Sequence, residues 1–338
     1  MPFSAAPDVK NRTSFAFEPA FLSDEEGRPL FVPIVKATFA IGSTGKLELA
    51  PQQPVNLTGE YWGDPDTSSY KYEPECAFEK LATDIALLGH AYASGRTATE
   101  VSVSLRVGSI EKVVTVIGDR YWEEGLAGRI RMSTPERFER IPLIYERAFG
   151  GFDQNDAERR ACEVRNPVGR GFRVRWDGAE HAVSLPNLED PQNRIRSLSD
   201  RPAPAGFGFL SPHWQPRVSF AGTYDASWTA ERSPLLPRDF NRRFFNAASP
   251  GLIAPGYLAG DEPVSVVNVS PNGSLDFSLP GIAAPQVEVT LRDGGVQTLP
   301  THLDTVVIDA DKCLLVMIWR AHLTVSNVPR DVAAVSVQ

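Results

Sequence analysis

The chain has 338 residues, with 34 Lys or Arg and 42 Asp or Glu, and its formal net charge is −8. This balance argues against a generic nucleic-acid binder, because such proteins carry a basic excess that neutralises phosphates. The 26 glycines and 28 prolines predict many turns and few long helices. Three widely spaced cysteines argue against a disulfide framework or a zinc ribbon.

The first third of the sequence predicts β-strands. Residues 30–39 are rich in β-branched and aromatic side chains, and Pro33 within them indicates a sheet edge or a bulge. Apolar and polar residues alternate over residues 97–107, and a second apolar run covers residues 113–117. The short Gly-Ser turn between these two runs predicts a β-hairpin.

The last third repeats this pattern. Residues 287–291 and 296–299 flank a turn that contains two glycines, which can adopt the positive φ angles of hairpin turns. Residues 306–308 and 314–317 flank a second short polar turn. We therefore predict a mainly β fold of antiparallel sheets in sandwich-like lobes, with long ordered loops and few short helices.

The middle of the chain, residues 121–259, has no such periodicity and is rich in proline-containing turns. It also holds four of the six tryptophans, which a solvated linker would not carry. We therefore expect loops that aromatic side chains pin onto the sheets, with one helix near residues 238–247. Ordered loops of this length are often functional.

Charge is distributed unevenly along the chain. Residues 1–119, 120–176 and 177–338 carry net charges of −6, +3 and −5, and every cation of the positive block is Arg. Arg suits bidentate, partly buried ion pairs and protein interfaces, so this block is a candidate binding surface. A GC-rich genome that encodes Arg by default is the alternative explanation.

These patterns predict one domain with a short tail at each end, at residues 13–325, 1–12 and 326–338. Within the domain we expect two β-rich lobes, residues 13–120 and 260–325, joined by the irregular segment 121–259. The sequence contains neither a secretory signal nor an apolar run of the roughly 18 residues that a membrane span needs. The expected location is therefore the cytoplasm, away from membranes.

The common catalytic signatures are absent from the sequence. It has no phosphate-binding loop, no dinucleotide-binding glycine motif, no zinc-protease motif and no nucleophile elbow. Ser109 and Lys112 match an S-x-x-K pattern, in which a lysine can activate a serine. They lie at a predicted hairpin turn, where the motif requires a helix start, so we do not assign them to catalysis.

Two further sets of residues have the chemical types of a calcium site and of a hydrolase site, but neither set has the complete sequence motif. Residues 64–75 space oxygen ligands like a calcium loop, but Ser69 stands where that loop needs glycine. A hydrolase site could be assembled in space around His90, Asp119 and His213, since such sites are defined by geometry. We predict no catalytic residue, no cofactor and no metal ion, and keep this hydrolase as an alternative.

Several blocks of the sequence resemble the bacterial domain-of-unknown-function family 2169. Two of them read TDIALLGHAYA at residues 83–93 and PLIYERAFGG at residues 142–151. The others occupy residues 103–108, 118–122, 166–172, 185–191, 204–208, 212–217, 221–225 and 244–248. The resemblance extends from about Thr13 to Arg320, which is nearly the whole chain.

The resemblance implies an accessory protein of type VI secretion. Proteins similar to this one are thought to hold a toxic effector, often one with a PAAR-like domain, and to help load it onto the VgrG spike. The implied partners are a cognate effector and the VgrG spike protein, with no nucleic acid and no membrane. An immunity-type or structural binding protein is the alternative that remains open.

A loading adaptor needs a wide protein-binding surface, and Trp, Tyr and Arg dominate the energetics of such surfaces. The middle segment is rich in these residues and in Phe. We predict partner binding for Tyr145, Arg147, Phe149, Arg170, Phe172, Trp214 and Trp228. The alternative for each of them is a structural anchor that fixes a loop to the sheet.

Overall fold

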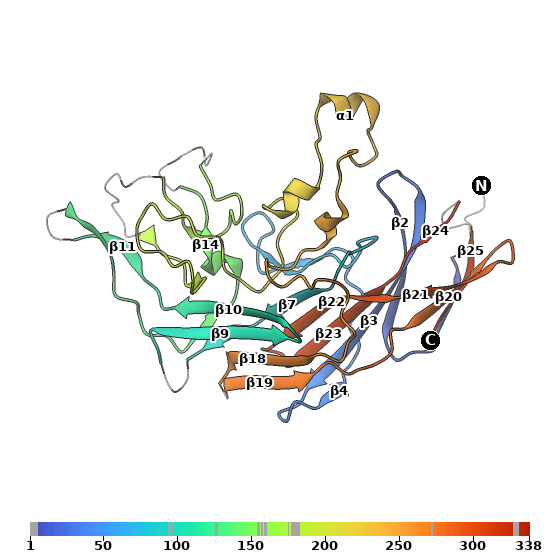
Figure 1. The fold of residues 1–338 in the computed structure, drawn as a ribbon, viewed down its shortest axis with the longest axis horizontal. Helices are drawn as coiled ribbons and strands as arrows, with labels where there is room; N and C mark the ends of the chain where they lie inside the picture. The colour runs from blue at the N-terminus through green and yellow to red at the C-terminus, as the bar shows by residue number, and fades with distance from the viewer. Residues whose placement is uncertain are drawn as a thin grey trace.

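The computed structural model confirms a mainly β fold, with 42% of residues in strands and 6% in helices. It describes residues 6–93, 95, 97–125, 128–153, 156, 158, 161–174, 176, 183–271, 273–326 and 331–338. Figure 1 shows the larger sheets side by side, with α1 (Ala226–Glu231) at the tip of a projection that stands away from them.

A seven-stranded sheet forms the centre of the fold. Its main path runs β2, β3, β23, β22, β7, and the short strands β4 and β24 also pair with β3. All of these contacts are antiparallel except the parallel pair of β22 and β7. The bounds are β2 (Ala16–Ser23), β3 (Pro29–Ile41), β4 (Leu47–Leu49), β7 (Asp84–Leu88), β22 (His302–Asp309), β23 (Leu314–Arg320) and β24 (Leu323–Thr324).

Two further sheets pack beside the central one. The five-stranded sheet has the order β17 (Leu188–Glu189), β10 (Ile110–Ile117), β9 (Glu100–Val107), β18 (Pro263–Ser270), β19 (Gly273–Ser278). The four-stranded sheet has the order β1 (Asp8–Asn11), β25 (Val332–Val337), β20 (Gln286–Leu291), β21 (Val296–Pro300). The hairpins β9–β10, β20–β21 and β22–β23 are the three that the sequence predicts.

The remaining elements are short. One small sheet contains β12 (Ile130–Met132), β11 (Tyr121–Glu124) and β16 (Val183–Ser184). The two-stranded pairs are β13 (Arg140–Pro142) with β8 (His90–Tyr92), β14 (Phe149–Gly150) with β15 (Arg170–Gly171), and β5 (Glu60–Tyr61) with β6 (Tyr70–Tyr72). The 3-10 turns are η2 (Tyr145–Arg147), η3 (Arg217–Phe220) and η4 (Arg242–Phe245).

The helix expected near residues 238–247 does not form. That stretch contains only the 3-10 turn η4, and the α-helix of the segment is α1, which lies earlier in the chain. The helix α1 begins after Asp225, whose carboxylate accepts a hydrogen bond from the Trp228 backbone N–H at 2.8 Å. This N-cap was the local signal for the helix start.

The sheets combine strands from both ends of the sequence. β3 pairs with β23, β7 with β22 and β9 with β18, so the first and last thirds do not form the two separate lobes expected from the sequence. The expected tails also differ from the structure, because β1 and β25 pair with each other in parallel. An alternating pattern predicts that a segment is a strand but not which strand it pairs with. The sequence therefore could not predict the mixed sheets or the pairing of the two terminal strands.

Pro33 lies inside an interior strand whose pairing with β2 has no register shift, so neither the sheet edge nor the bulge expected at this position is present. It stands opposite Pro19 of β2. On its other side, β23 ends at Arg320 and β24 begins at Leu323, so the missing N–H of Pro33 falls at the break between two strands. The Pro33 carbonyl accepts a bond from the Ala321 N–H there at 3.4 Å.

Side chains of β3 alternate between two hydrophobic clusters. Val35 and Phe39 belong to the large cluster, which includes residues of the five-stranded and four-stranded sheets. Val32 and Ile34 lie on the opposite face and join a smaller cluster with Phe209 of the middle segment. The central sheet is therefore covered on both faces, by other sheets on one and by irregular chain on the other.

Candidate functional site

A hollow of about 700 Å³ opens in the middle segment. Its walls come from the turn between β5 and β6, from β14 and β15 with the residues beside them, from β16, and from the chain before η3. We call it the Arg170 hollow. The residues that give it its chemistry are Asp153, Arg170, Phe172, Arg173, His213 and Trp214.

Glycines allow the two backbone segments in the wall to approach each other closely. β14 and β15 pair in parallel, with Phe149 opposite Arg170 and Gly150 opposite Gly171. A Cβ on Gly151, whose φ is +89°, would overlap the carbonyl oxygen of Gly169. The wall therefore has a fixed shape that depends on the absence of side chains at these positions.

Arg170 brings incompletely compensated positive charge to the hollow. Its Nε donates to the Glu146 carbonyl oxygen at 2.9 Å, and its terminal nitrogens have no acceptor among the described residues. Burial and the charge of Arg147 lower the pKa of Arg170, which indicates a site that disfavours an unpaired cation. A carboxylate that entered the hollow would supply the missing acceptor.

The acidic residues of the wall are largely occupied by the protein itself. Asp153 accepts from Arg173 at 3.2 Å and from the Val174 N–H at 2.9 Å. Asp156 accepts from the backbone N–H groups of Glu158 and Ala161. These carboxylates hold their own loops in place, and neither is a described hydrogen-bond acceptor for Arg170.

Aromatic residues form the apolar part of the hollow. Trp214 lines the hollow but is almost fully buried, whereas Phe172 is half-buried. The Arg201 guanidinium lies 5.1 Å from the centre of the Phe172 ring. His213 is exposed at the rim, and partial burial together with Arg217 lowers the pKa of its imidazole. The hollow therefore combines a cation with aromatic surface.

Three other residues assigned to partner binding lie behind the hollow. Tyr145 and Phe149 are each only 2% exposed, so a partner cannot touch them directly. Arg147 is half-buried, and its guanidinium binds Asp119 at 3.0 Å and the Asn187 side-chain oxygen at 3.1 Å. These residues support the β14–β15 wall from inside, which is the anchoring role that the sequence left as the alternative.

Trp228 lies apart from the hollow. It belongs to residues 221–241, which we call the arm and which carry α1 at the tip of the projection in Figure 1. Its ring is half-buried against Tyr224, with ring centres 4.7 Å apart, and its indole N–H donates to the Leu235 carbonyl. Arg232 fixes the arm to the β2–β3 turn through Glu26 at 2.7 Å.

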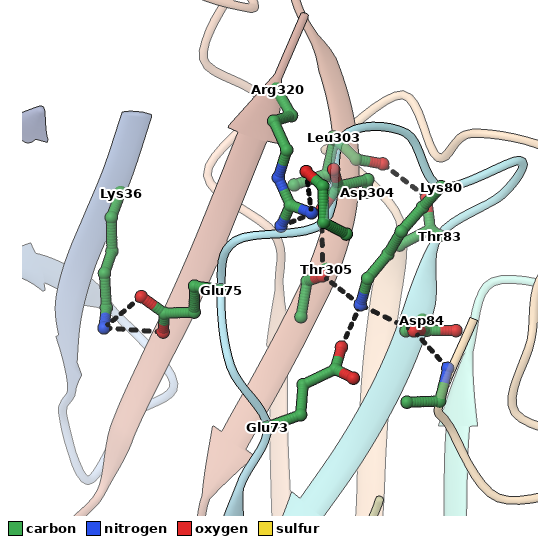
Figure 2. A network of polar contacts seen from close by, with 12 residues as sticks. Lys36, Glu73, Glu75, Lys80, Thr83, Asp84, Leu303, Asp304, Thr305 and Arg320 are labelled. Atoms are coloured by element: carbon green, nitrogen blue, oxygen red, sulfur yellow. Dashed lines mark hydrogen bonds and ion pairs between the residues drawn. The ribbon is translucent and has the colours of Figure 1, made fainter. Parts of the chain in front are cut away.

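A network of buried ion pairs lies on the second face of the central sheet (Figure 2). Lys80 is at its centre, and its Nζ donates to Asp84 at 2.7 Å, to Thr305 at 3.1 Å and to Glu73. Nearby, Lys36 of β3 binds Glu75 at 2.7 Å. The network residues that belong to strands of the central sheet all project from this second face, toward the irregular chain that covers it.

The charges of this network balance one another. Four cations face four carboxylates, namely Lys36, Lys80, Arg217 and Arg320 against Glu73, Glu75, Asp84 and Asp304. Burial opposes the charge of Lys80, but the Asp84 and Glu73 carboxylates outweigh it and raise the pKa of this lysine. A balanced and hydrogen-bonded set of this kind is structural, because it fixes the covering chain onto the sheet. Sequence reasoning missed it.

A second polar cluster has the residue types of a serine nucleophile with a lysine base. Lys112 Nζ donates to Ser249 Oγ at 2.6 Å, the Tyr145 hydroxyl donates to the same oxygen at 2.8 Å, and Ser249 donates to the Gly206 carbonyl. Burial lowers the pKa of Lys112 to about 8. Ser249, however, is fully buried, so no substrate reaches its oxygen.

The residues of the alternative hydrolase lie in three different surroundings. The His90 Nδ1 contacts Asp311 Oδ2 at 2.7 Å. Asp119 accepts from Arg147 and from Asn187, whereas His213 stands at the rim of the Arg170 hollow. The described contacts therefore do not join them into one site.

The loop at residues 64–75, which spaces oxygen ligands like a calcium loop, does not have the geometry of a metal site in the structure. Glu75, the twelfth residue of that loop, binds the buried Lys36 instead of closing around an ion. Across the described ranges, no group of three or more His, Cys, Asp or Glu side chains is arranged to hold a metal. In the same part of the chain, no helix has the length and apolar character needed to cross a bilayer.

Comparison with known proteins gives one match. Residues 26–320 match the model of family DUF2169, described as "uncharacterized protein conserved in bacteria". No curated protein and no solved structure matches the chain. The matched region includes the Arg170 hollow, the arm and the buried ion network, and it spans well over half of the sequence. The chain therefore belongs to the DUF2169 family of bacterial proteins.

Proposed function

We propose that this protein is a type VI secretion accessory protein that binds a cognate effector, often a PAAR-like one. It stabilises this effector in the cytoplasm of the producing cell and helps to load it onto the VgrG spike. Membership of the DUF2169 family supports the proposal through the role that the sequence resemblance implies. The proposal is for a binding protein without catalytic activity.

The observation that carries the proposal is the Arg170 hollow. Arg170 offers terminal guanidinium nitrogens without described acceptors, beside the half-buried ring of Phe172. Arg and aromatic side chains in a shaped hollow are typical anchor points of protein interfaces. Its volume of about 700 Å³ lies within the range of roughly 300–1,000 Å³ usual for binding clefts. We expect an effector carboxylate next to an apolar side chain to enter here.

The polar clusters support a non-catalytic role. Ser249 has the neighbours of a nucleophile but is fully buried, and Lys80 is engaged by carboxylates within the core. An accessible nucleophile with a neighbouring base, which hydrolysis by a side chain requires, is not found in either cluster.

Co-expression with the effector encoded beside this gene tests the proposal. We expect the tagged protein to raise the soluble level of the effector and to co-purify with it. The Arg170→Ala variant should retain about tenfold less effector, because a charged interface anchor is lost. Arg131→Ala is the matched control, since Arg131 forms an exposed pair with Glu123 and should leave retention unchanged.

Two results would contradict the proposal. The first is that the wild-type protein retains neither the effector nor VgrG. The second is that expression in a recipient cell protects against the toxin while deletion in the donor leaves secretion intact. That second pattern would identify an immunity protein.

A further inference from the structure

A second hollow, about 490 Å³ in volume, lies at the base of the arm. Its floor is formed by small or apolar buried residues, Ala82, Leu210, Ala248 and Ala254. Phe220 and Arg243 stand at one side, in the turns η3 and η4. We call this hollow the Arg243 groove.

The rim of the groove exposes large apolar side chains to water. Leu81 is 44% exposed and Ile253 is 40% exposed, although both line the groove. Pro216, Pro250 and Pro255 complete an apolar rim. Contiguous apolar surface around a concave floor is typical of a site that another molecule covers.

The groove has positive charge and no acid of its own. None of its described lining residues is Asp or Glu. Arg243 is exposed, lies 6.0 Å over the Phe220 ring, and has no carboxylate partner among the described residues. The buried Arg217 also lines the groove, but the buried Glu73 carboxylate at 3.5 Å already balances its charge, and it donates to the Leu210 and Phe244 carbonyls. Lys112 lies close by, because its Nζ donates to the Pro250 carbonyl at 2.8 Å.

Neighbouring residues of one stretch of chain line the groove and the Arg170 hollow. His213 and Trp214 line the hollow, whereas Pro216 and Arg217, a few residues later, line the groove. Phe220 and Arg243 also stand next to the two ends of the arm. A protein that binds over the hollow would therefore also lie close to the groove, because adjacent residues of this stretch line the two cavities.

We propose that the Arg243 groove binds a short apolar segment of the effector that carries one carboxylate next to aliphatic side chains. The aliphatic groups cover Leu81 and Ile253, and the carboxylate pairs with Arg243. Charge complementarity selects this occupant, because Arg243 has no described carboxylate partner and the groove lining supplies no acid, which leaves the negative charge to the ligand. The proposal rests on the proposed function, since the segment belongs to the bound effector.

Fluorescence anisotropy with overlapping labelled peptides that tile the neighbouring-encoded effector tests this inference. We expect binding by peptides that combine Leu, Ile or Val with an Asp or Glu. Replacing that acid by its amide should weaken binding about tenfold, as expected for loss of a charge-assisted hydrogen bond. Decanoate serves as a competitor that has the same charge and apolar character without a peptide backbone.

Variants of the groove separate this site from the hollow. Arg243→Glu should weaken the peptide about tenfold or more, and a peptide with Lys in place of its acid should recover binding to this variant. Leu81→Asp and Ile253→Asp should also weaken it, since both side chains line the groove and are partly exposed to water. Arg238→Glu is the control, because Arg238 lies on the arm outside the groove lining with 77% of its side chain exposed.

Several outcomes would overturn the inference. These are the absence of any binding peptide, equal binding by the acid and amide forms, equal binding by wild type and Arg243→Glu, or tight binding of decanoate alone. A change of oligomeric state in Leu81→Asp would assign the groove to a second copy of the chain. If the effector co-purifies and the Arg243→Glu variant retains it fully, this inference fails while the proposed function stands.

Discussion

Lys112 of β10 donates a hydrogen bond to Ser249, which lies 137 residues later in the chain, with 2.6 Å between Nζ and Oγ. The serine of the S-x-x-K pattern, Ser109, is exposed at the hairpin turn. The lysine of that pattern therefore ties the five-stranded sheet to the middle segment. This link also reaches Tyr145, which supports the wall of the Arg170 hollow.

Replacing Ser249 by Ala should lower the free energy of unfolding by about 1–3 kcal/mol, because the buried Tyr145 hydroxyl loses its acceptor. Chemical denaturation in urea measures the change. Ser109→Ala is the control and should stay within about 0.5 kcal/mol of wild type, since its side chain is exposed. Equal stability of the two variants would show that the cluster contributes nothing.

The stability of the protein should depend on pH through Lys112. Burial lowers the pKa of this lysine from 10.5 to about 8, with Asp190 acting in the opposite direction. Between these two values the unfolded chain holds a proton that the folded chain has released, so raising the pH favours folding. Below about pH 8 the lysine is charged in both states and this dependence ends.

Lys112→Arg isolates this effect, because arginine stays protonated throughout the window. Relative to Lys112→Arg, wild type should gain stability as the pH rises from about 8 to 10.5, measured by urea denaturation at several pH values. Lys46→Arg is the control and should show no such gain over the same range, because the hydrogen bond to the Glu48 carboxylate raises the pKa of Lys46. If the stability difference between wild type and Lys112→Arg also did not rise with pH, the pKa of Lys112 would not be lowered by folding.

Loss of Lys80 should be among the most destabilising single changes in the chain. Lys80→Met leaves Asp84 and Glu73 buried without their shared cation, so we expect a loss of about 3–5 kcal/mol in urea denaturation. The exposed pair of Lys46 with Glu48 provides the control, and Lys46→Met should change stability by about 0–1 kcal/mol. A Lys80→Met variant as stable as wild type would mean that water enters the network.

Two glycines with nearly the same backbone conformation test the wall of the hollow. Gly151 and Gly251 have φ angles of +89° and +87°, but only Gly151 has a backbone carbonyl, that of Gly169, where a Cβ would lie. Gly251→Ala should cost about 1–2 kcal/mol through backbone strain alone. Gly151→Ala should cost about 1–3 kcal/mol more because of the overlap.

Thermal or urea unfolding of the two variants side by side gives this difference directly. Equal destabilisation would show that the wall yields to a methyl group and has no fixed shape. In that case the effector should also bind the Gly151→Ala variant normally.

The strands were predictable from the sequence because their side chains alternate. The β9–β10 hairpin is an example, with buried Val103 and Leu105 on one face. The pairing of β3 with β23 was not predictable, because alternation specifies a face and not a neighbour. Lys36 illustrates a further limit: a lysine in a strand normally marks the solvent face, but here both faces of β3 are covered.

The sequence indicated which segment of the chain holds the candidate site, but only some of the residues that line it. Arg170 and Phe172 line the hollow, as their residue types in the Arg-rich segment indicated. Tyr145 has the same favourable type but lies in the core, since aromatic residues serve interfaces and interiors equally well. The Arg243 groove had no sequence signal, because its lining comes from three stretches that are distant in the chain.

The pairing of β3 with β23 has a consequence for the order of events during protein synthesis. A ribosome makes Phe31 and Val35 long before Trp319, so the apolar β3 waits for its neighbour until most of the chain has emerged. Unpaired apolar strands are prone to aggregation during such a delay. A protein of this topology therefore carries an unpaired apolar strand through most of its own synthesis.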